Sequence, residues 1–183
     1  MKTIYITGYK PYEIGIYKNN QPEVRFIKLF LQDKIKSYID EGLEWVIIQG
    51  NLGIELWAAE VVLRLKKHYD IKLGIITPFL NHFEKWNEEN QLYYQQISSK
   101  ADYMNSVFQD TYKGGYMFSQ ANHFILDNTE GTMLFYDEEH EASPKFFKKT
   151  LVDFMEENQY TMDSISLFDL SEFVSEYMRE QEN

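Results

Sequence analysis

The sequence predicts an α/β protein in three layers, with a mostly parallel β-sheet between helices on both faces. Short apolar runs, typical of buried strands, alternate along the chain with stretches in which apolar residues recur every three or four positions, as in amphipathic helices. Such alternation favours parallel strands joined by crossover helices. No linker long enough to separate domains interrupts the 183 residues, so we expect one domain over residues 1–183.

The first half of the chain follows this pattern closely. The apolar run at 4–6 ends in Thr7-Gly8, and Thr77-Pro78 ends a later run in the same way. Pro22 suits the first turn of a helix, and Gly42 suits a position just beyond its end. The elements expected here are strands at 4–6, 45–48 and 73–76 and helices at 22–39 and 54–69.

The second half is less regular. The polar stretch 81–100 is expected to be one helix whose inner residues are Phe83, Trp86, Tyr93 and Ile97. Ser143-Pro144 predicts a helix start, with the serine as N-cap and the proline at the first helical position. The other elements expected here are strands at 103–108 and 132–136, an edge strand at 164–167, and helices at 118–127 and 169–180.

Composition and charge exclude several classes of protein. The 18 Lys and Arg residues against 29 Asp and Glu residues give a net charge of −11, so the surface repels phosphates and nucleic acid is not expected as the main partner. Without cysteine there is no disulfide framework, thiolate zinc site or cysteine nucleophile. We expect a cytoplasmic protein with no membrane span, because no apolar run is long enough for one and the N-terminus does not have the pattern of a signal peptide.

No metal site is expected either. The four histidines show no ligand spacing with one another, and His140 lies in the acidic stretch 137–141, which is typical of a solvated loop. In a parallel sheet, ligands bind outside the carboxyl ends of the strands. The loops that follow the strands are therefore the candidate sites.

The turn after the second strand is the strongest candidate ligand site. Gly50 and Gly53 allow close approach of a ligand to the backbone, and the helix start offers unpaired N–H groups to an anion. Gly50, Asn51 and Gly53 are predicted to hold a phosphate through their backbone N–H groups. Glu55 is predicted to accept a hydrogen bond from a ribose hydroxyl. The alternative is that the glycines only make a tight turn and that Glu55 only stabilises the positive end of the helix dipole.

Two neighbouring loops add candidates. After the first strand, Gly8 allows close approach, Lys10 is placed to meet a phosphate, and Tyr9 to stack on a base. After the third strand, Thr77, Pro78 and Phe79 are predicted to flank the ligand. Further polar candidates follow later in the chain. They are Tyr112, Lys113 and Asn122.

Several motifs, taken in order, resemble the YpsA family of small bacterial proteins. The segments that carry the resemblance run from the first strand to about Lys145. They are residues 6–11 with Glu13 and Gly15, 41–45, 50–60, 76–79, 134–137 and 143–145. The resemblance implies a Rossmann-like fold of the SLOG superfamily, which includes DprA and the LOG hydrolases, and a nucleotide-type ligand such as ADP-ribose or an NAD-like cofactor. The family's glycine and acidic positions fall on Gly53 and Glu55. The Pro-Gly-Gly-x-Gly-Thr loop of the LOG enzymes is absent from 137–145.

Three functions stay open at this point. The first is a nucleotide-binding sensor or regulatory domain. The second is an enzyme that cleaves a glycosidic bond of a nucleotide derivative, with Glu55 or Asp137 as acid or nucleophile. The third is a scaffold that binds a protein partner or a second copy of itself, which the acidic amphipathic end and the 14 tyrosines and 13 phenylalanines favour.

Overall fold

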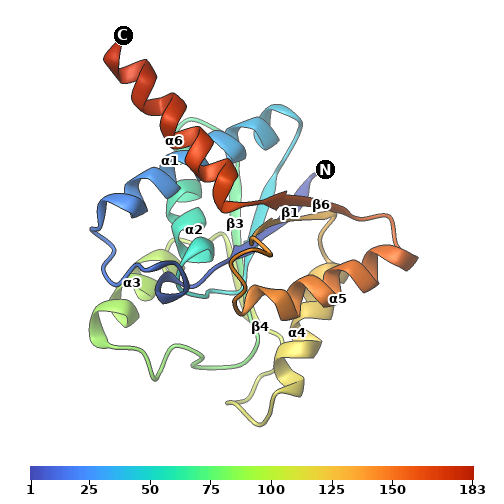
Figure 1. Ribbon diagram of the computed structural model, residues 1–183. Coiled ribbons are helices and arrows are strands. Elements are labelled where there is room, and N and C mark those ends of the chain that lie inside the picture. The colour runs from blue at the N-terminus through green and yellow to red at the C-terminus, as the bar shows by residue number, and fades with distance from the viewer.

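The sheet is parallel throughout, as the alternating pattern predicts. The computed structural model describes residues 1–183 and contains six strands in the order β4-β3-β2-β1-β5-β6 (Figure 1). Every neighbouring pair is parallel. The strands are β1 (Thr3–Gly8), β2 (Trp45–Ile48), β3 (Lys72–Thr77), β4 (Tyr103–Ser106), β5 (Gly131–Phe135) and β6 (Thr161–Ile165).

Helices cover both faces of this sheet and complete the Rossmann-like three-layer architecture (Figure 1). On one face α1 packs against α2 and α6, and α2 packs against α3; on the other face α4 packs against α5. A short 3₁₀ helix, Pro11–Ile14, follows β1. The helices are α1 (Pro22–Asp40), α2 (Ile54–Leu65), α3 (Glu88–Ser98), α4 (Tyr116–Asp127), α5 (Pro144–Glu157) and α6 (Leu167–Glu182).

The strand order reverses beside β1. The chain moves outward from β1 through β2 and β3 to β4, and α4 then brings it back to β5 on the other side of β1. Right-handed crossovers explain the two layers, because connections that run in opposite directions along a sheet place their helices on opposite faces. The carboxyl ends of β1 and β5 therefore flank the topological switch point, where open α/β sheets bind ligands.

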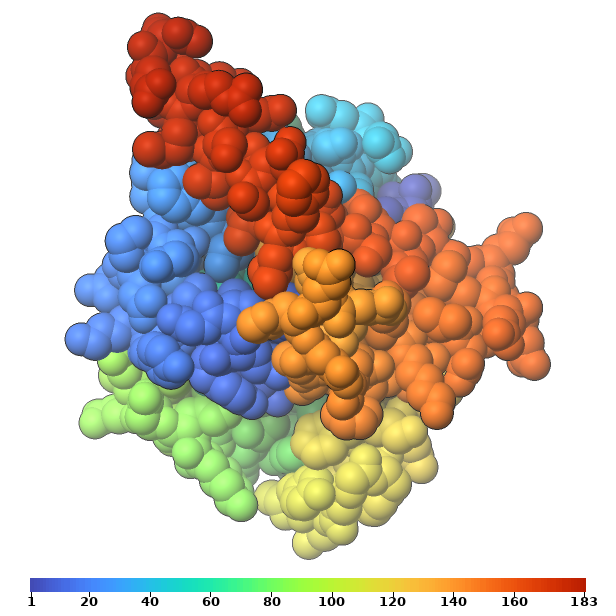
Figure 2. Space-filling model, viewed as in Figure 1, coloured from blue at the N-terminus to red at the C-terminus, as the bar shows by residue number.

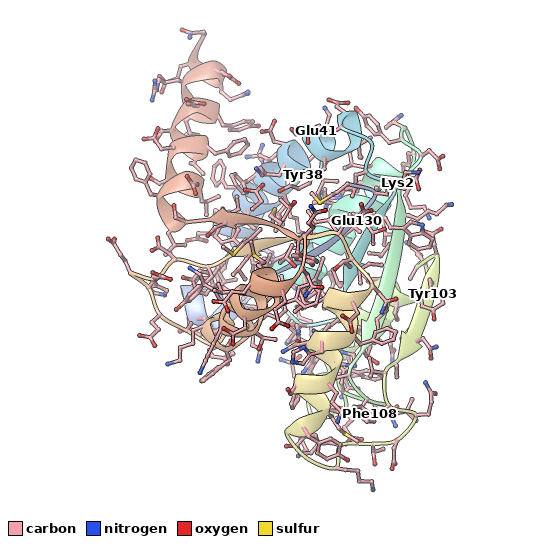
Figure 3. All side chains as sticks on the ribbon, turned by 90° about the vertical axis from the view of Figure 1, so that its right-hand side faces the viewer. Lys2, Tyr38, Glu41, Tyr103, Phe108 and Glu130 are labelled. Atoms are coloured by element: carbon pink, nitrogen blue, oxygen red, sulfur yellow. The ribbon has the colours of Figure 1, made fainter.

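One hydrophobic core holds the layers together. It contains 38 buried residues, with Trp57, Tyr5, Tyr9 and Tyr94 among its largest fully buried side chains. The edge strand β4, which carries Tyr103 (Figure 3), is different, because Tyr103 and Met104 are each 48% exposed. At the amino ends of the central strands, the Lys2 backbone N–H donates to Glu130 Oε1 at 2.9 Å (Figure 3).

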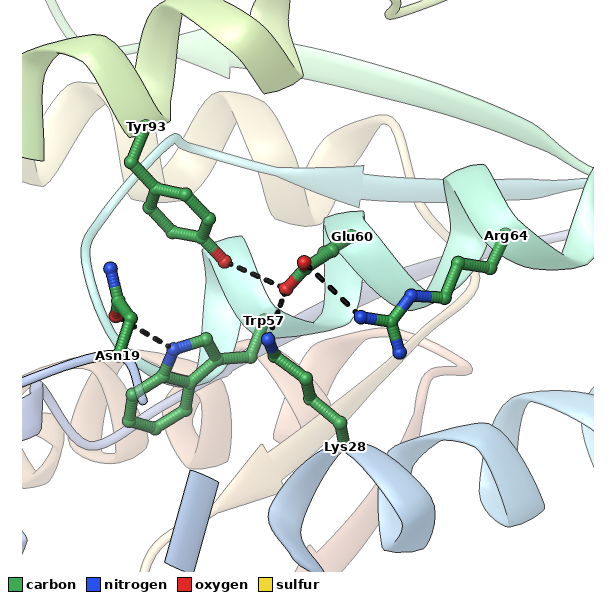
Figure 4. A network of polar contacts seen from close by, with 6 residues as sticks. All are labelled: Asn19, Lys28, Trp57, Glu60, Arg64 and Tyr93. Carbon is green, nitrogen blue, oxygen red and sulfur yellow. Dashed lines mark hydrogen bonds and ion pairs between the residues drawn. The ribbon is translucent and has the colours of Figure 1, made fainter. Parts of the chain in front are cut away.

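A polar cluster joins the three helices α1, α2 and α3. The carboxylate of Glu60 lies 2.5 Å from Lys28 Nζ of α1 and 3.2 Å from Arg64 of its own helix. It also accepts a hydrogen bond from the Tyr93 hydroxyl of α3 at 3.1 Å (Figure 4). Burial, and then the Glu60 charge, raise the pKa of Tyr93, so the phenol stays a neutral donor.

The expected helix 81–100 is wrong in its first third. The helix α3 begins at Glu88, because the Asn87 side chain accepts from the Asn90 N–H at 2.8 Å and caps it. Residues 78–86 form turns instead, and Asn81 has a φ of 57°. These turns bring His82, Phe83 and Trp86 against Tyr94, with ring centroids 4.9–5.9 Å apart.

Smaller differences concern helix and strand ends. Pro144 is at the first helical position as predicted, but Ser143 has helical φ and ψ of −54° and −30°, and its side chain makes no cap. The helix α2 ends at Leu65 rather than at residue 69, and β4 ends at Ser106 rather than at 108. The edge strand lies at 161–165, slightly earlier than predicted.

The last helix starts with a capping box that the sequence interpretation missed. Ser166 Oγ accepts from the Asp169 N–H at 3.0 Å, and Asp169 accepts from the Ser166 N–H at 2.8 Å. No residue of α6 is buried, and the helix projects from the body of the molecule (Figure 2). None of the helices combines the length and apolarity that a membrane crossing needs.

Candidate functional site

A buried carboxylate lies at the carboxyl ends of β1 and β2. Glu55, in the first turn of α2, is 1% exposed, and its two oxygens accept five hydrogen bonds. Three of the donors are side chains that contact Oε2. They are the Tyr5 hydroxyl at 3.0 Å, the Thr7 hydroxyl at 2.7 Å and Asn51 Nδ2 at 2.9 Å. The backbone N–H groups of Gln49 and Asn51 contact Oε1 at 2.7 and 3.3 Å.

This arrangement suits an ionised carboxylate that organises the site. A carboxylate is an acceptor only, and five converging donors offset the cost of burying its charge. Burial, and then the Glu55 charge, raise the pKa of Tyr5 well above its ordinary value, so the phenol donates and does not ionise. With both oxygens occupied, Glu55 has the geometry of a positioning residue that joins β1, β2 and α2.

Hydrogen bonds continue from Glu55 across the sheet to α4. Gln49, the residue after β2, donates from Nε2 to the Tyr5 oxygen at 3.2 Å and to Asn122 Oδ1 at 2.8 Å. Gln49 is 5% exposed, and Asn122 is half-buried on α4. The polar group thus extends from one helical layer to the other at a single edge of the sheet.

The glycine turn is packed tightly against the loop after β1. Gly53 has a φ of +94°, and a Cβ added there would lie 2.3 Å from the Tyr9 carbonyl oxygen. The Ile54 N–H donates to that same oxygen at 3.1 Å. Gly50 also has a positive φ, of +89°, and an added Cβ would meet the ring of His82 at 3.0 Å. Close packing is therefore one reason for glycine at both positions.

Four N–H groups at this turn are free. Those of Gly50, Leu52, Gly53 and Glu55 donate to no group of the chain, and the last three lie at or beside the start of α2. The N–H of Asn51, predicted to hold a phosphate, instead donates to Glu55. The N–H groups of Leu52, Gly53 and Glu55 are therefore suited to an external anionic acceptor, as free N–H groups at the start of a helix commonly are.

Tyr9 and Lys10, both in the loop after β1, differ in their burial and contacts. Lys10 is half-buried, and its ammonium forms no ion pair. The Tyr9 ring is 0% exposed and packs against Phe135 and Tyr136, so it is not available to stack on a base. Gly8 packs closely too, since an added Cβ would lie 2.5 Å from the Phe135 carbonyl oxygen.

The acidic loop after β5 is tied to its surroundings. The Asp137 carboxylate accepts from the Glu139 N–H at 2.9 Å and from the Leu167 N–H at 3.1 Å. It therefore holds its own loop and the first residue of α6. No group of three or more metal-ligating side chains is present in the structure.

A second region at the carboxyl ends of the strands is aromatic and contains a cavity. Thr77, Pro78 and Phe79 are all buried, and Thr77 Oγ1 bonds to Ser106 Oγ at 2.6 Å. Next to them is a cavity of about 360 Å³, lined in part by Phe79, Tyr112 and Phe118 with ring centroids 5.3–5.8 Å apart. His82 also lines it, and its Nε2–H donates to the Gly50 carbonyl at 3.0 Å. Burial lowers the pKa of His82, which favours this neutral form.

The structure thus gathers most of the predicted residues at the carboxyl edge of the sheet, where the Asn51 N–H and the Tyr9 ring are engaged within the chain. Lys10 and the Gly50–Gly53 turn lie together, while Thr77, Pro78 and Phe79 lie on the far side of Gly50. Sequence reasoning missed Tyr5 and Gln49, and gave Asn122 little weight. Only their place at strand ends, or on a helix far along the chain, distinguishes them in the sequence.

These features define a Rossmann-like α/β protein with an organised polar edge at its topological switch point. The family model for YpsA, described as the YspA SLOG family, matches residues 4–170, which extends past the segments that carry the resemblance. The chain belongs to this family.

Close relatives cover all or nearly all of the chain. A UPF0398 protein of Macrococcus caseolyticus (strain JCSC5402) is 68% identical over 182 residues, which span 100% of both chains. A UPF0398 protein of Staphylococcus haemolyticus (strain JCSC1435) is 52% identical over 183 residues, or 100% of this chain and 98% of the relative. One from Staphylococcus aureus (strain JH9) is 51% identical over 177 residues, or 96% and 95%.

Proposed function

We propose that this protein binds a nucleotide derivative at the carboxyl ends of β1 and β2, as a sensor or regulatory domain. The observation that carries the proposal is the set of free N–H groups of Leu52, Gly53 and Glu55 at the start of α2. They surround a turn that a buried carboxylate holds in place. Membership of the SLOG family supports a nucleotide-type ligand such as ADP-ribose or an NAD-like molecule.

In this proposal the phosphates bind where positive potential is concentrated. The N-terminus of a helix carries partial positive charge, and its free N–H groups donate hydrogen bonds to anionic oxygens. Gly53 packs on the backbone of Tyr9 and Lys10, and the Lys10 ammonium forms no ion pair. This local set binds an anion despite the net charge of −11, because distant exposed charges are screened within about 8–10 Å.

Glu55 has an indirect role in the proposed site. Its carboxylate fixes the Asn51 side chain and the Gln49 backbone, which hold the turn in shape. The ribose and the base then lie toward Gly50 and the aromatic cavity near Phe79.

Calorimetric titration with ADP-ribose, NAD and AMP tests the proposal. The variant Lys10→Gln removes one charge at the proposed phosphate site, and we expect at least a tenfold weaker affinity, or about 1.4 kcal/mol. Lys36→Gln is the matched control, because Lys36 is exposed on α1 and forms no ion pair. Absence of binding to every compound, or equal weakening by both variants, contradicts the proposal.

A further inference from the structure

The direction of the hydrogen bonds between Glu55 and Asn122 follows from chemistry. The Glu55 carboxylate only accepts, so the single Tyr5 hydroxyl proton points to it. The Tyr5 oxygen can then only accept from Gln49, which requires the amide nitrogen of Gln49 to face it. The second N–H of Gln49 points to Asn122 Oδ1 at 2.8 Å. The buried charge thus orients both amides.

This orientation leaves one acceptor and one donor without a partner in the chain. They are Gln49 Oε1 and Asn122 Nδ2, neither of which forms another hydrogen bond. The Tyr94 hydroxyl is the one fully buried side-chain polar atom without a partner, so both of these atoms reach the solvent. Gln49 as a whole is 5% exposed, so its free oxygen opens outward from an otherwise enclosed side chain.

The two amides belong to segments that border the aromatic cavity. Gln49 precedes Gly50, whose carbonyl binds the cavity residue His82 at 3.0 Å. Asn122 lies one helical turn after Phe118, another cavity residue, and residues four apart share a face of a helix. The amides do not line the cavity themselves, but aromatic faces on the same segments as a hydrogen-bonding pair suit a flat group that stacks and is read along its edge.

We propose that Gln49 and Asn122 select a planar ligand group that carries a hydrogen-bond donor beside an acceptor. Adenine has this pattern in its exocyclic N–H₂ and the neighbouring ring nitrogen, and amide side chains read it in this way. A carboxamide, as in nicotinamide, has the same pattern. Hypoxanthine, when its ribose phosphate is bound in the same orientation, exchanges the positions of the donor and the acceptor at the Watson–Crick edge, and a carboxylate lacks the donor. The inference rests on the proposed function and names the ligand class of that site.

Two pairs of mononucleotides test this selection in the wild-type protein without any substitution. The first pair is AMP and IMP, and the second is nicotinamide mononucleotide and nicotinic acid mononucleotide. We expect at least tenfold tighter binding of AMP or of nicotinamide mononucleotide than of its partner, because a site with fixed polar groups rejects a mismatched ligand. The pair that shows the preference identifies the planar group.

Substitution at Asn122 tests whether this residue hydrogen-bonds to the edge of the planar ligand group. In Asn122→Asp the bond from Gln49 is kept but the outward donor is lost, so the affinity ratio within the preferred pair falls at least tenfold. Gln120→Glu is the control, because it adds the same charge at an exposed position of α4 and leaves the ratio unchanged. Circular dichroism verifies that both variants are folded.

The outcomes separate this inference from the proposed function. Equal affinities within both pairs, or a ratio that Asn122→Asp leaves unchanged, overturn the edge selection. If those ligands still bind and Lys10→Gln still weakens them, the proposed function stands. If no mononucleotide and no larger nucleotide binds, both fail.

Discussion

The hydroxyl oxygen of Tyr9 accepts a hydrogen bond from the Asp137 backbone N–H at 2.8 Å. The same hydroxyl donates to the His140 carbonyl at 2.7 Å. One side chain from the loop after β1 thus fixes the loop after β5, on the other side of the topological switch point. Because Asp137 also binds the Leu167 N–H, this contact reaches the start of α6.

Removal of the Tyr9 hydroxyl is expected to loosen this connection. Tyr9→Phe leaves the half-buried Asp137 N–H without its partner, which costs about 1–3 kcal/mol of unfolding free energy. Urea denaturation measures the loss, and hydrogen exchange should quicken at 137–140. Tyr12→Phe, at a side chain that is 62% exposed, should change neither. Equal stability of the two variants contradicts the importance of this bond.

Replacement of Glu55 by glutamine is expected to destabilise the fold. The amide nitrogen would face N–H or O–H donors whichever oxygen it replaces, since all five partners of Glu55 donate. Loss of charge-assisted bonds and at least one unpaired donor cost about 2–4 kcal/mol. Glu156→Gln, at an exposed position of α5, serves as the control in the same denaturation experiment. A Glu55→Gln protein as stable as this control would show that Glu55 does not organise the turn.

Gly53→Ala is expected to destabilise the protein whether or not a ligand is present. The new methyl group would lie 2.3 Å from the Tyr9 carbonyl oxygen, at a φ of +94° that side chains rarely adopt. A loss above about 2 kcal/mol would lower the melting temperature by about 4 °C or more in a chain of this length. Gly115→Ala is the matched control, because its φ is −61° and no atom lies within 4 Å of the added carbon. Equal melting temperatures would contradict the packing described for this turn.

His82 is expected to make stability depend on pH. Burial lowers its pKa in the folded protein, so the unfolded chain binds more protons as the pH falls below about 6.5. The stability contribution of neutral His82 is present above that pH and is lost as the pH falls toward the folded pKa. Denaturation at pH 7.5, 6.5 and 5.5 should show a steeper loss for the wild type than for His82→Gln. Parallel curves would contradict the assignment.

Much of the fold follows from the sequence, because strands and helices with clear periodicity need no distant information. The helix predicted over 81–87 is absent, because the cap at Asn87 and the contacts with Tyr94 outweigh the helical spacing of Phe83 and Trp86. Ser143 shows the same limit, because its N–H binds Glu13, far away in the sequence, at 2.8 Å.

Within the site, the glycine turn and Glu55 have a local pattern that the sequence reveals. The packing of Gly53 on Tyr9 and the bond between Gln49 and Asn122 do not, because each joins segments brought together only by the sheet order. The direction in which the Gln49 and Asn122 amides point depends in turn on the Glu55 carboxylate of α2. Such relationships arise only when the folded chain brings distant segments together.

The position of β5 beside β1 has a consequence for synthesis of the chain on the ribosome. The strands β1–β4 can pair once residue 106 has emerged, but the other edge of β1 stays open until residues 131–135 follow. That edge belongs to an apolar strand, and unpaired strand edges promote association between chains. Truncated products that end before residue 131 should therefore aggregate or recruit chaperones, whereas chains that include β5 close the central strand on both sides.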